Sequence, residues 1–211
     1  MLFQQVRLDQ YKIDQGYNIA PLFFFLTNLY LFFAYHIIFI KVNNIDKMKI
    51  PDKFNEFLKK KKWKLFQYQH EFLNNFYYFK NKRFLISSDT GTGKTLSMIL
   101  PVLINALNDR RENIIYISPL KSIINDLFEN LNLIIKDLKL NLKIGKRTGD
   151  ESYLSKKNQI QKPDNILLTT PESLALMISK KETNDYFKNI SYIAIDELNE
   201  MVSTKRGDQL S

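Results

Sequence analysis

The stretch SDTGTGKT at residues 88–95 constrains the fold more than any other part of the chain. It lies between a β-rich run, RFLIS at 83–87, and a helical pattern over 94–107. Glycines at such a turn let backbone N–H groups approach an anion closely, and the N-terminus of the following helix adds the positive end of its dipole. We therefore predict a phosphate-binding loop in which the N–H groups of Gly91, Thr92 and Gly93 point at the phosphates.

The two residues that end this loop, Lys94 and Thr95, extend the prediction to a nucleoside triphosphate with Mg²⁺. The Lys94 ammonium would reach the β- and γ-phosphates, and the Thr95 hydroxyl would bind Mg²⁺. Ser88 stands where the full pattern begins with Gly or Ala, and serine is small enough to replace either. The loop alone leaves the function open, because kinases, GTPases, transporters and motors share it.

Short β-rich runs alternate with helical patterns along residues 48–211. The β-rich runs lie at 83–87, 113–118, 165–170 and 191–196, and the helical patterns between them cover 94–107, 120–137 and 171–180. Two more helices are expected upstream: one after Pro51, with Phe54, Phe57 and Leu58 on one face, and one over 68–79. This alternation predicts a single α/β domain over 48–211, with a parallel sheet covered by helices on both faces.

The sequence YIAIDELNE at 192–200 narrows the function. Residues 192–195 are typical of a buried strand, which places Asp196 and Glu197 at its carboxyl end, where ligands bind in parallel α/β sheets. Asp196 can hold Mg²⁺ through its water shell, and Glu197 can orient or deprotonate an attacking water. A carboxylate pair at the end of a strand, about a hundred residues after Gly-Lys-Thr, therefore predicts a nucleoside-triphosphate hydrolase.

The first 47 residues differ from the rest of the chain. The segment PLFFFLTNLYLFFAYHIIFI at 21–40 carries no formal charge, and an apolar helix over 22–40 would be roughly 28 Å long, close to a bilayer core. The lysines that follow would place its C-terminal side in the cytoplasm. Three interpretations stay open: a membrane span, a buried helix, or spurious upstream translation with Met48 as the true start.

The net charge of +9 and a pI near 9.5 favour an anionic partner. The excess gathers in residues 48–82, where nine lysines stand against three acids. The chain has no cysteine, which excludes disulfides and thiolate metal sites. Its two histidines, His36 and His70, are too few and too far apart to predict a histidine metal site.

Several motifs occur in an order that resembles the superfamily 2 DNA/RNA helicases with an Asp-Glu-x-His/Asp box. TGTGKT (90–95) resembles helicase motif I, SPLKSI (118–123) motif Ia, TTPESL (169–174) motif Ib and DELN (196–199) motif II. RTGD (147–150) and the lead-in of Trp63, Phe66 and Gln69 are similar to the large helicase-related (Lhr) branch, including its ligase-associated group. The resemblance covers residues from about 57 to 211 and implies a RecA-like P-loop NTPase domain.

The resemblance also implies a role for each matching position. Motif I would bind ATP through Thr90, Gly91, Thr92, Gly93, Lys94 and Thr95, with Gln69 reading the adenine edge. Thr95 and Asp196 would hold Mg²⁺, and the catalytic residues would be Glu197, Asp196 and Lys94. A single strand of DNA or RNA, bound without regard to sequence, would be contacted by Pro119, Lys121, Thr148, Gly149, Asp150, Thr170, Pro171 and Glu172. Gln69 also fits an ordinary surface position of a helix, and Thr170 also fits a helix N-cap.

Two departures from the family pattern shape the expected function. Asn199 stands where motif II ends in His or Asp, and asparagine can hydrogen-bond but cannot carry charge. The chain also ends at Ser211, before the second RecA-like lobe that supplies arginines for phosphoryl transfer in these helicases. We therefore expect residues 48–211 to be the first helicase lobe, truncated after motif II. Two origins stay open: a truncated gene, or a split gene whose second lobe is encoded separately.

Two other functions stay open: a nucleic-acid- and ATP-binding module without motor activity, and a membrane-tethered ATPase. The expected location is cytoplasmic. The alternative is a membrane anchor at 22–40 with the ATPase domain in the cytoplasm.

Overall fold

The computed structural model describes residues 49–78, 83–87, 91–197 and 200. The apolar segment at 22–40, Ser88 and Thr90 of the phosphate loop, and Asn199 of motif II lie outside these residues. Within the described ranges, no helix is both long enough and apolar enough to cross a bilayer.

The sheet of the described residues has four parallel strands in the order β2-β3-β1-β4. They are β1 (Asn113–Ile117), β2 (Ile144–Arg147), β3 (Ile166–Thr169) and β4 (Ile190–Ile195). Ile117 of β1 pairs with Thr169 of β3 and with Ile195 of β4. The carboxyl ends of these strands therefore meet at one edge of the sheet, and Asp196 follows directly at that edge.

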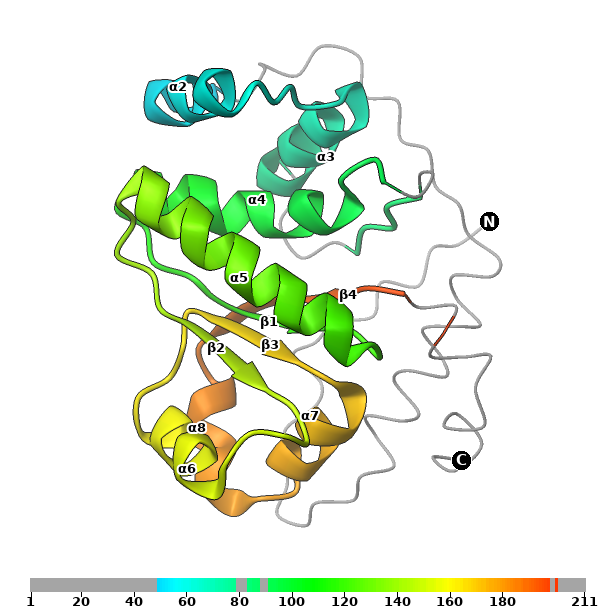
Figure 1. Cartoon of the computed structure of the whole chain (residues 1–211), viewed down its shortest axis with the longest axis vertical. Coiled ribbons are helices and arrows are strands. Elements are labelled where there is room, and N and C mark those ends of the chain that lie inside the picture. Colours follow the sequence, from blue (N-terminus) through cyan, green and yellow to red (C-terminus); the bar gives the residue numbers. More distant parts are fainter. Residues whose placement is uncertain (1–48, 79–82, 88–90, 198–199, 201–211) are drawn as a thin grey trace.

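Helices cover both faces of this sheet, as predicted (Figure 1). One face carries α2 (Asp52–Lys61), α3 (Gln67–Tyr78), α4 (Lys94–Leu107) and α5 (Lys121–Leu138). The other carries α7 (Pro171–Ile178), the 3-10 turn η2 (Lys181–Thr183) and α8 (Asn184–Phe187), and Figure 1 shows α6 (Tyr153–Gln161) on the same side. Parallel strands need crossover connections of this kind, so the helices follow from the strand order.

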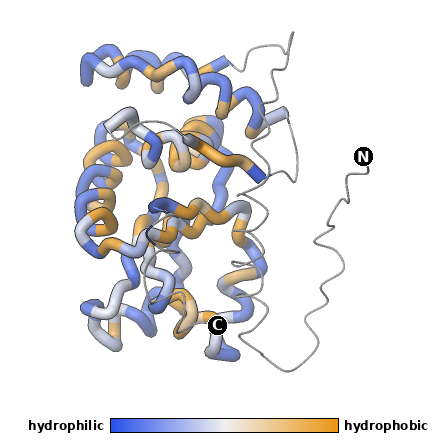
Figure 2. Tube along the Cα trace, turned by 90° about the vertical axis from the view of Figure 1, so that its right-hand side faces the viewer, coloured by the Kyte–Doolittle hydropathy of each residue, from blue (hydrophilic) through white to orange (hydrophobic). Residues whose placement is uncertain are grey.

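Alternate residues of each strand face opposite layers of the core. Ile114 and Tyr116 of β1 pack in a cluster with residues of α4 and α5, whereas Ile115 and Ile117 pack with Leu174 of α7. Figure 2 shows apolar stretches along the central strands, while the helices alternate between apolar and polar residues. Burial of each large apolar side chain contributes about 1.5–3 kcal/mol, so this two-sided burial stabilises the sheet that positions the motifs.

The predicted strand over 83–87 is wrong, because these residues pair with no strand of the described sheet. The ring of Phe84 packs instead against Phe72 and Phe76 of α3, with ring centroids 5.6 Å and 6.2 Å apart. Leu85 is half exposed. Aromatic packing on α3 thus holds this segment in place of a hydrogen-bonded ladder.

Four elements go beyond the predicted pattern, namely β2, α6, η2 and α8. β2 has the sequence IGKR and lies at the edge of the sheet, where the Thr169 hydroxyl of β3 donates to the Arg147 carbonyl at 2.8 Å. α6 begins where the Ser152 hydroxyl accepts from the Ser155 N–H. A short, half-buried edge strand needs no apolar run, which is why periodicity alone does not find β2.

Candidate nucleotide and nucleic-acid sites

The phosphate loop turns through two glycines in the left-handed region. Gly91 has φ +77° and Gly93 has φ +82°, conformations that other residues adopt only with strain. Gly93 is the N-cap of α4, and it has no side chain to cap the helix. A helix N-terminus entered through glycine, followed by Lys94 and Thr95, is the arrangement that binds phosphate through backbone N–H groups.

Thr95 and Asp196 come together although they are 101 positions apart. The Thr95 hydroxyl in the first turn of α4 donates to Asp196 Oδ2 at 3.1 Å, at the carboxyl end of β4. A hydroxyl and a carboxylate are oxygen ligands of the kind Mg²⁺ prefers. The described residues contain no cluster of three or more His, Cys, Asp or Glu side chains that could hold a metal. Mg²⁺ is commonly bound by one or two protein oxygens together with phosphates and water, and the Thr95–Asp196 pair fits that mode.

Asp196 has two further hydrogen bonds. Its Oδ1 accepts from the Glu197 N–H at 2.9 Å, and its Oδ2 also accepts from the hydroxyl of Tyr116, a fully buried residue of β1. Burial and the bond to Asp196 raise the pKa of the Tyr116 phenol well above its usual value, so this hydroxyl remains a donor at neutral pH. The motifs do not predict Tyr116; the available signal is a lone hydroxyl in the otherwise apolar run IIYI.

Glu197 follows Asp196 in a left-handed conformation, with φ +51°. This turn ends β4 and leaves the Glu197 residue exposed beside the nearly buried Asp196. Two adjacent carboxylates thus have different surroundings: one is held by three hydrogen-bond donors, and the other meets solvent. An exposed carboxylate can orient a water molecule, and a buried and bonded one can hold a cation.

Gln69 of α3 is buried and joined to the phosphate loop, so it is not an ordinary surface residue. Its Oε1 accepts from the Phe66 N–H at 2.9 Å, and its Nε2 donates to the Gly93 carbonyl and to the Ser97 hydroxyl, both at 3.1 Å. Tyr68, next to it, donates its hydroxyl to the Thr92 carbonyl at 2.7 Å. These contacts fix the loop against α3, and the adenine-reading role of Gln69 stays a prediction.

Three of the predicted nucleic-acid residues gather on the surface after β1 and β2. The Lys121 ammonium at the start of α5 lies 2.8 Å from the Asp150 carboxylate, and both side chains are at least half exposed. A Cβ on Gly149 would lie 3.6 Å from Lys121 Nζ, so the three residues are neighbours. The hydrogen bond from Lys121 lowers the pKa of Asp150.

The remaining predicted nucleic-acid residues are divided between surface and interior. Thr148 is buried after β2, and Thr170 is buried as the N-cap of α7, where its hydroxyl accepts from the Ser173 N–H. Pro171 occupies the first turn of that helix, Glu172 is exposed beside it, and Pro119 is half-buried after β1. The N-cap interpretation of Thr170 is therefore confirmed. Because its side chain is buried, any contact of Thr170 with single-stranded nucleic acid would have to come from its backbone.

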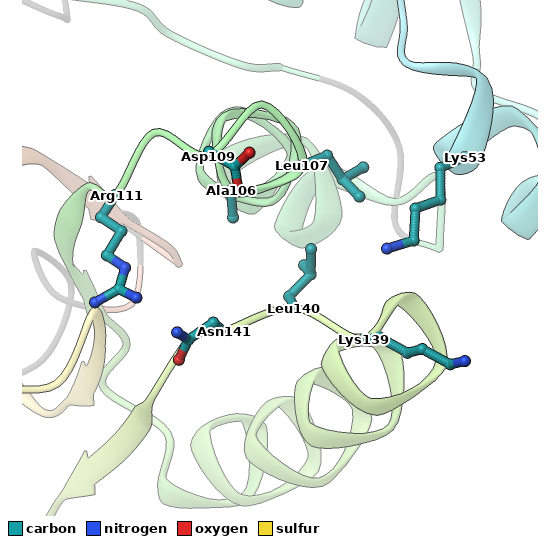
Figure 3. Close-up of a pocket in the computed structure, with 8 residues that line it drawn as sticks. All are labelled: Lys53, Ala106, Leu107, Asp109, Arg111, Lys139, Leu140 and Asn141. Carbon is teal, nitrogen blue, oxygen red and sulfur yellow. The ribbon is translucent and has the colours of Figure 1, made fainter.

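A cavity of about 330 Å³ lies away from these residues, at the amino edge of the sheet (Figure 3). Both α4 and α5 end there, so their carbonyl ends and the negative ends of their dipoles are close to it. The negative ends of the two helix dipoles disfavour a phosphate group in this cavity, although its lining includes several cationic side chains. The lining residues are Lys53, Ala106, Leu107, Asp109, Arg111, Lys139, Leu140 and Asn141.

Comparison with known proteins places these motifs in a family. Residues 66–211 match the DEAD/DEAH box helicases. The ATP-dependent helicase Lhr-Core of Saccharolobus solfataricus is 34% identical over 145 residues, which are 63% of this chain and 17% of that protein. The Lhr helicase/uracil glycosylase of Escherichia coli is 29% identical over 153 residues, or 63% of this chain and 10% of that protein. The chain thus matches a small part of much longer proteins.

Solved structures show the same fold. The DUF1998 helicase MrfA bound to DNA and AMPPNP superposes with a TM-score of 0.64 and 25% identity, covering 82% of this chain and 26% of that one. The Mycobacterium smegmatis helicase Lhr bound to ssDNA and AMP-PNP gives a TM-score of 0.64 at 24% identity, covering 75% and 21%. The parallel sheet with its two helical layers is therefore a RecA-like helicase fold. Because the family match covers most of the chain, this protein belongs to the DEAD/DEAH box helicase family and is Lhr-like within it.

Proposed function

We propose that the chain is the first, ATP-binding lobe of an Lhr-like ATP-dependent helicase, and that it binds Mg-ATP and the backbone of single-stranded nucleic acid. The hydrogen bond between Thr95 and Asp196 carries this proposal. It joins the phosphate loop to the DELN motif and places two oxygen ligands beside the N-terminus of α4. A chance Gly-Lys-Thr turn would have no reason to meet an acidic residue at the carboxyl edge of the sheet.

Each residue of the nucleotide site would then have a distinct role. The N–H groups of the loop and the start of α4 would hold the phosphates, and Lys94 would neutralise the β- and γ-phosphates. Thr95 and Asp196 would hold the ion, and Mg²⁺ in that place would offset the charge that develops during phosphoryl transfer. Glu197 would orient the attacking water from its exposed position.

The nucleic-acid part of the proposal rests on Lys121, Gly149 and Asp150. Their cluster lies after β1 and β2, at the carboxyl edge of the same sheet as Asp196. Lysine contacts phosphate as a point charge and reads no base, so binding would be independent of sequence. The Mycobacterium smegmatis Lhr and MrfA structures, which contain ssDNA and DNA respectively, support this assignment by similarity of fold.

Motor activity would need a second RecA-like lobe in addition to this one. Arginines that a second lobe supplies for phosphoryl transfer are worth about 10³–10⁵ in rate in related nucleotidases. The first lobe by itself should therefore hydrolyse ATP slowly. A cytoplasmic location is part of the same proposal.

The proposal is tested by titrating the full chain with a fluorescent ATP analogue in the presence of Mg²⁺. Lys94→Ala should abolish binding, because the phosphates lose their main cation. Glu197→Gln should keep binding and abolish the residual hydrolysis, which single-turnover assays with radiolabelled ATP would measure. Lys60→Ala, which removes an exposed lysine of α2, is the matched control. Equal affinity in the Lys94 and Lys60 variants would refute the proposed nucleotide site.

A further inference from the structure

Tyr116 is the feature of this site that the motifs leave unexplained. It lies one residue before the carboxyl end of β1, a strand with a neighbour on each side, it is fully buried, and it is flanked by isoleucines. A buried phenol needs a hydrogen-bond partner, and the partner here is Asp196 Oδ2. β1 and β4 are paired in register, with Tyr116 opposite Ala194, so the phenol extends past the end of β4 to reach Asp196.

The carboxylate of Asp196 is held by three donors from three elements. The hydroxyls of Tyr116 and Thr95 donate to Oδ2, and the Glu197 N–H donates to Oδ1. Thr95 is only half-buried and sits at the mouth of the loop, so its oxygen is free to turn toward an ion. Tyr116 is enclosed by the core and has no such freedom. When an ion engages the lone pairs of Thr95, its hydroxyl has two tasks, whereas the hydroxyl of Tyr116 serves the carboxylate alone.

We propose that Tyr116 is a positioning residue that orients the Asp196 carboxylate for a divalent cation bound with the nucleotide. This inference rests on the proposed function. Groups that hydrogen-bond a metal ligand fix its direction, and their removal weakens metal binding even though they never touch the ion. Without the phenol, Thr95 alone would remain on Oδ2, and it would have to serve the carboxylate and the ion at once.

The test measures metal binding and not turnover. Mn²⁺, which has an electron paramagnetic resonance signal, is titrated into the full chain with ADP, and free Mn²⁺ is followed. Tyr116→Phe removes one oxygen and keeps the ring, and it should weaken Mn²⁺ binding about tenfold, the lower end for a group that supports a metal ligand. Binding of a fluorescent ADP analogue in EDTA should be unchanged in this variant, because the phosphate loop is intact.

Tyr192→Phe is the matched control, because Tyr192 of β4 donates its hydroxyl to the Met98 carbonyl, away from Asp196. It should leave the Mn²⁺ affinity as in the wild type. Unchanged Mn²⁺ affinity in Tyr116→Phe, or equal weakening in both variants, would overturn the inference. Asp196→Asn distinguishes failure of the role proposed for Tyr116 from failure of the proposed nucleotide and metal site. If it binds Mn²⁺ like the wild type, or if the wild type binds no Mn²⁺ with ADP, the proposed function fails as well.

A second measurement does not depend on the folding of a variant. The full chain is prepared with 3-fluorotyrosine at position 116 alone, and its fluorine resonance is recorded with ADP before and after addition of Mg²⁺. The resonance should shift, because the acceptor of the phenol takes up the ion. A resonance that stays in place on saturation with Mg²⁺ would show that Tyr116 does not support the metal ligand.

Discussion

The ammonium of Lys121 and the carboxylate of Asp150 form an ion pair 2.8 Å long between the start of α5 and the loop after β2. The pair lies on the surface that we assign to the nucleic-acid backbone, so a phosphate and Asp150 would compete for the same cation. The bond to Lys121 lowers the pKa of Asp150, so the carboxylate stays charged, and the pair stays formed, to a more acidic pH than for an unpaired aspartate. Asp150 therefore positions Lys121 and at the same time weakens its attraction for phosphate.

Asp150→Asn is expected to raise the affinity for single-stranded DNA about two- to fivefold at moderate salt. The expected gain is small because exposed ion pairs contribute little. The measurement is fluorescence anisotropy with a labelled oligonucleotide. Asp137→Asn is the matched control, because Asp137 pairs with Lys61 at the same distance of 2.8 Å at the other end of α5. Equal gains in both variants would show that only net charge matters.

Lys121→Ala is expected to weaken nucleic-acid binding without changing the preference among sequences. Each phosphate neutralised on a single strand contributes about −0.7 to the slope of log affinity against log salt. The wild type should show a shallow slope of roughly −1 to −3, and the variant should lose less than one unit of it. Salt titrations with single strands of different composition check both points. A tight, salt-insensitive complex, or a strong preference for one sequence, would argue against a helicase surface here.

Gly145→Ala is expected to destabilise the fold by about 1–3 kcal/mol, as overpacking of an interior does. A Cβ at Gly145 would collide with the carboxylate of Asp164. Asp164 is buried and cannot move aside cheaply, because it accepts from Gln159 Nε2 at 2.6 Å and pairs with Lys143 at 2.9 Å. Urea unfolding gives the free energy directly.

The control for this change is Gly149→Ala, in which the added Cβ would meet only Lys121 Nζ at 3.6 Å. It should unfold at the same urea concentration as the wild type. If the two glycine variants unfold together, the close packing of β2 against Asp164 does not contribute to stability.

Apolar runs in the sequence predicted the strands that are apolar throughout. They failed where packing against other elements decides whether a segment forms a strand. The runs at 113–118, 165–170 and 191–196 correspond to β1, β3 and β4, because buried parallel strands need continuous apolar sequence. The run at 83–87 has the same character, yet Phe84 packs on α3 and the segment forms no ladder. β2 carries Gly145, Lys146 and Arg147 and forms because β3 lies beside it.

The site was predictable to the extent that its residues belong to motifs. Thr95 and Asp196 are in contact, as their places after a glycine loop and after a strand suggest. Tyr116 and Ser97 were not predictable, because their contacts with Asp196 and Gln69 depend on strand register and on how α3 packs against α4. Side chains that support a site through tertiary contacts leave little local trace in the sequence.

A chain beginning at Met48 is expected to be soluble and to unfold cooperatively. The two apolar clusters of the described residues run from Phe54 to Ala194 and from Ile115 to Tyr186, and the chemical motifs all lie beyond Met48. Circular dichroism during urea unfolding is the measurement. If this chain aggregates while the full chain stays soluble without detergent, the segment at 22–40 belongs to the core.

Gln69→Ala is expected to weaken nucleotide binding, and to weaken ATP binding more than GTP binding. The amide of Gln69 holds the Gly93 carbonyl, so its removal loosens the phosphate loop for any nucleotide. An amide that also reads the adenine edge would add a loss for ATP alone, because it can both donate and accept. Ser97→Ala is the control, since it removes one partner of Gln69 and leaves the amide in place. Competition of ATP and GTP against a fluorescent nucleotide gives both affinities for the wild type and for each of the two variants. Equal losses for ATP and GTP in Gln69→Ala would leave Gln69 as a support of the loop and remove it from adenine recognition.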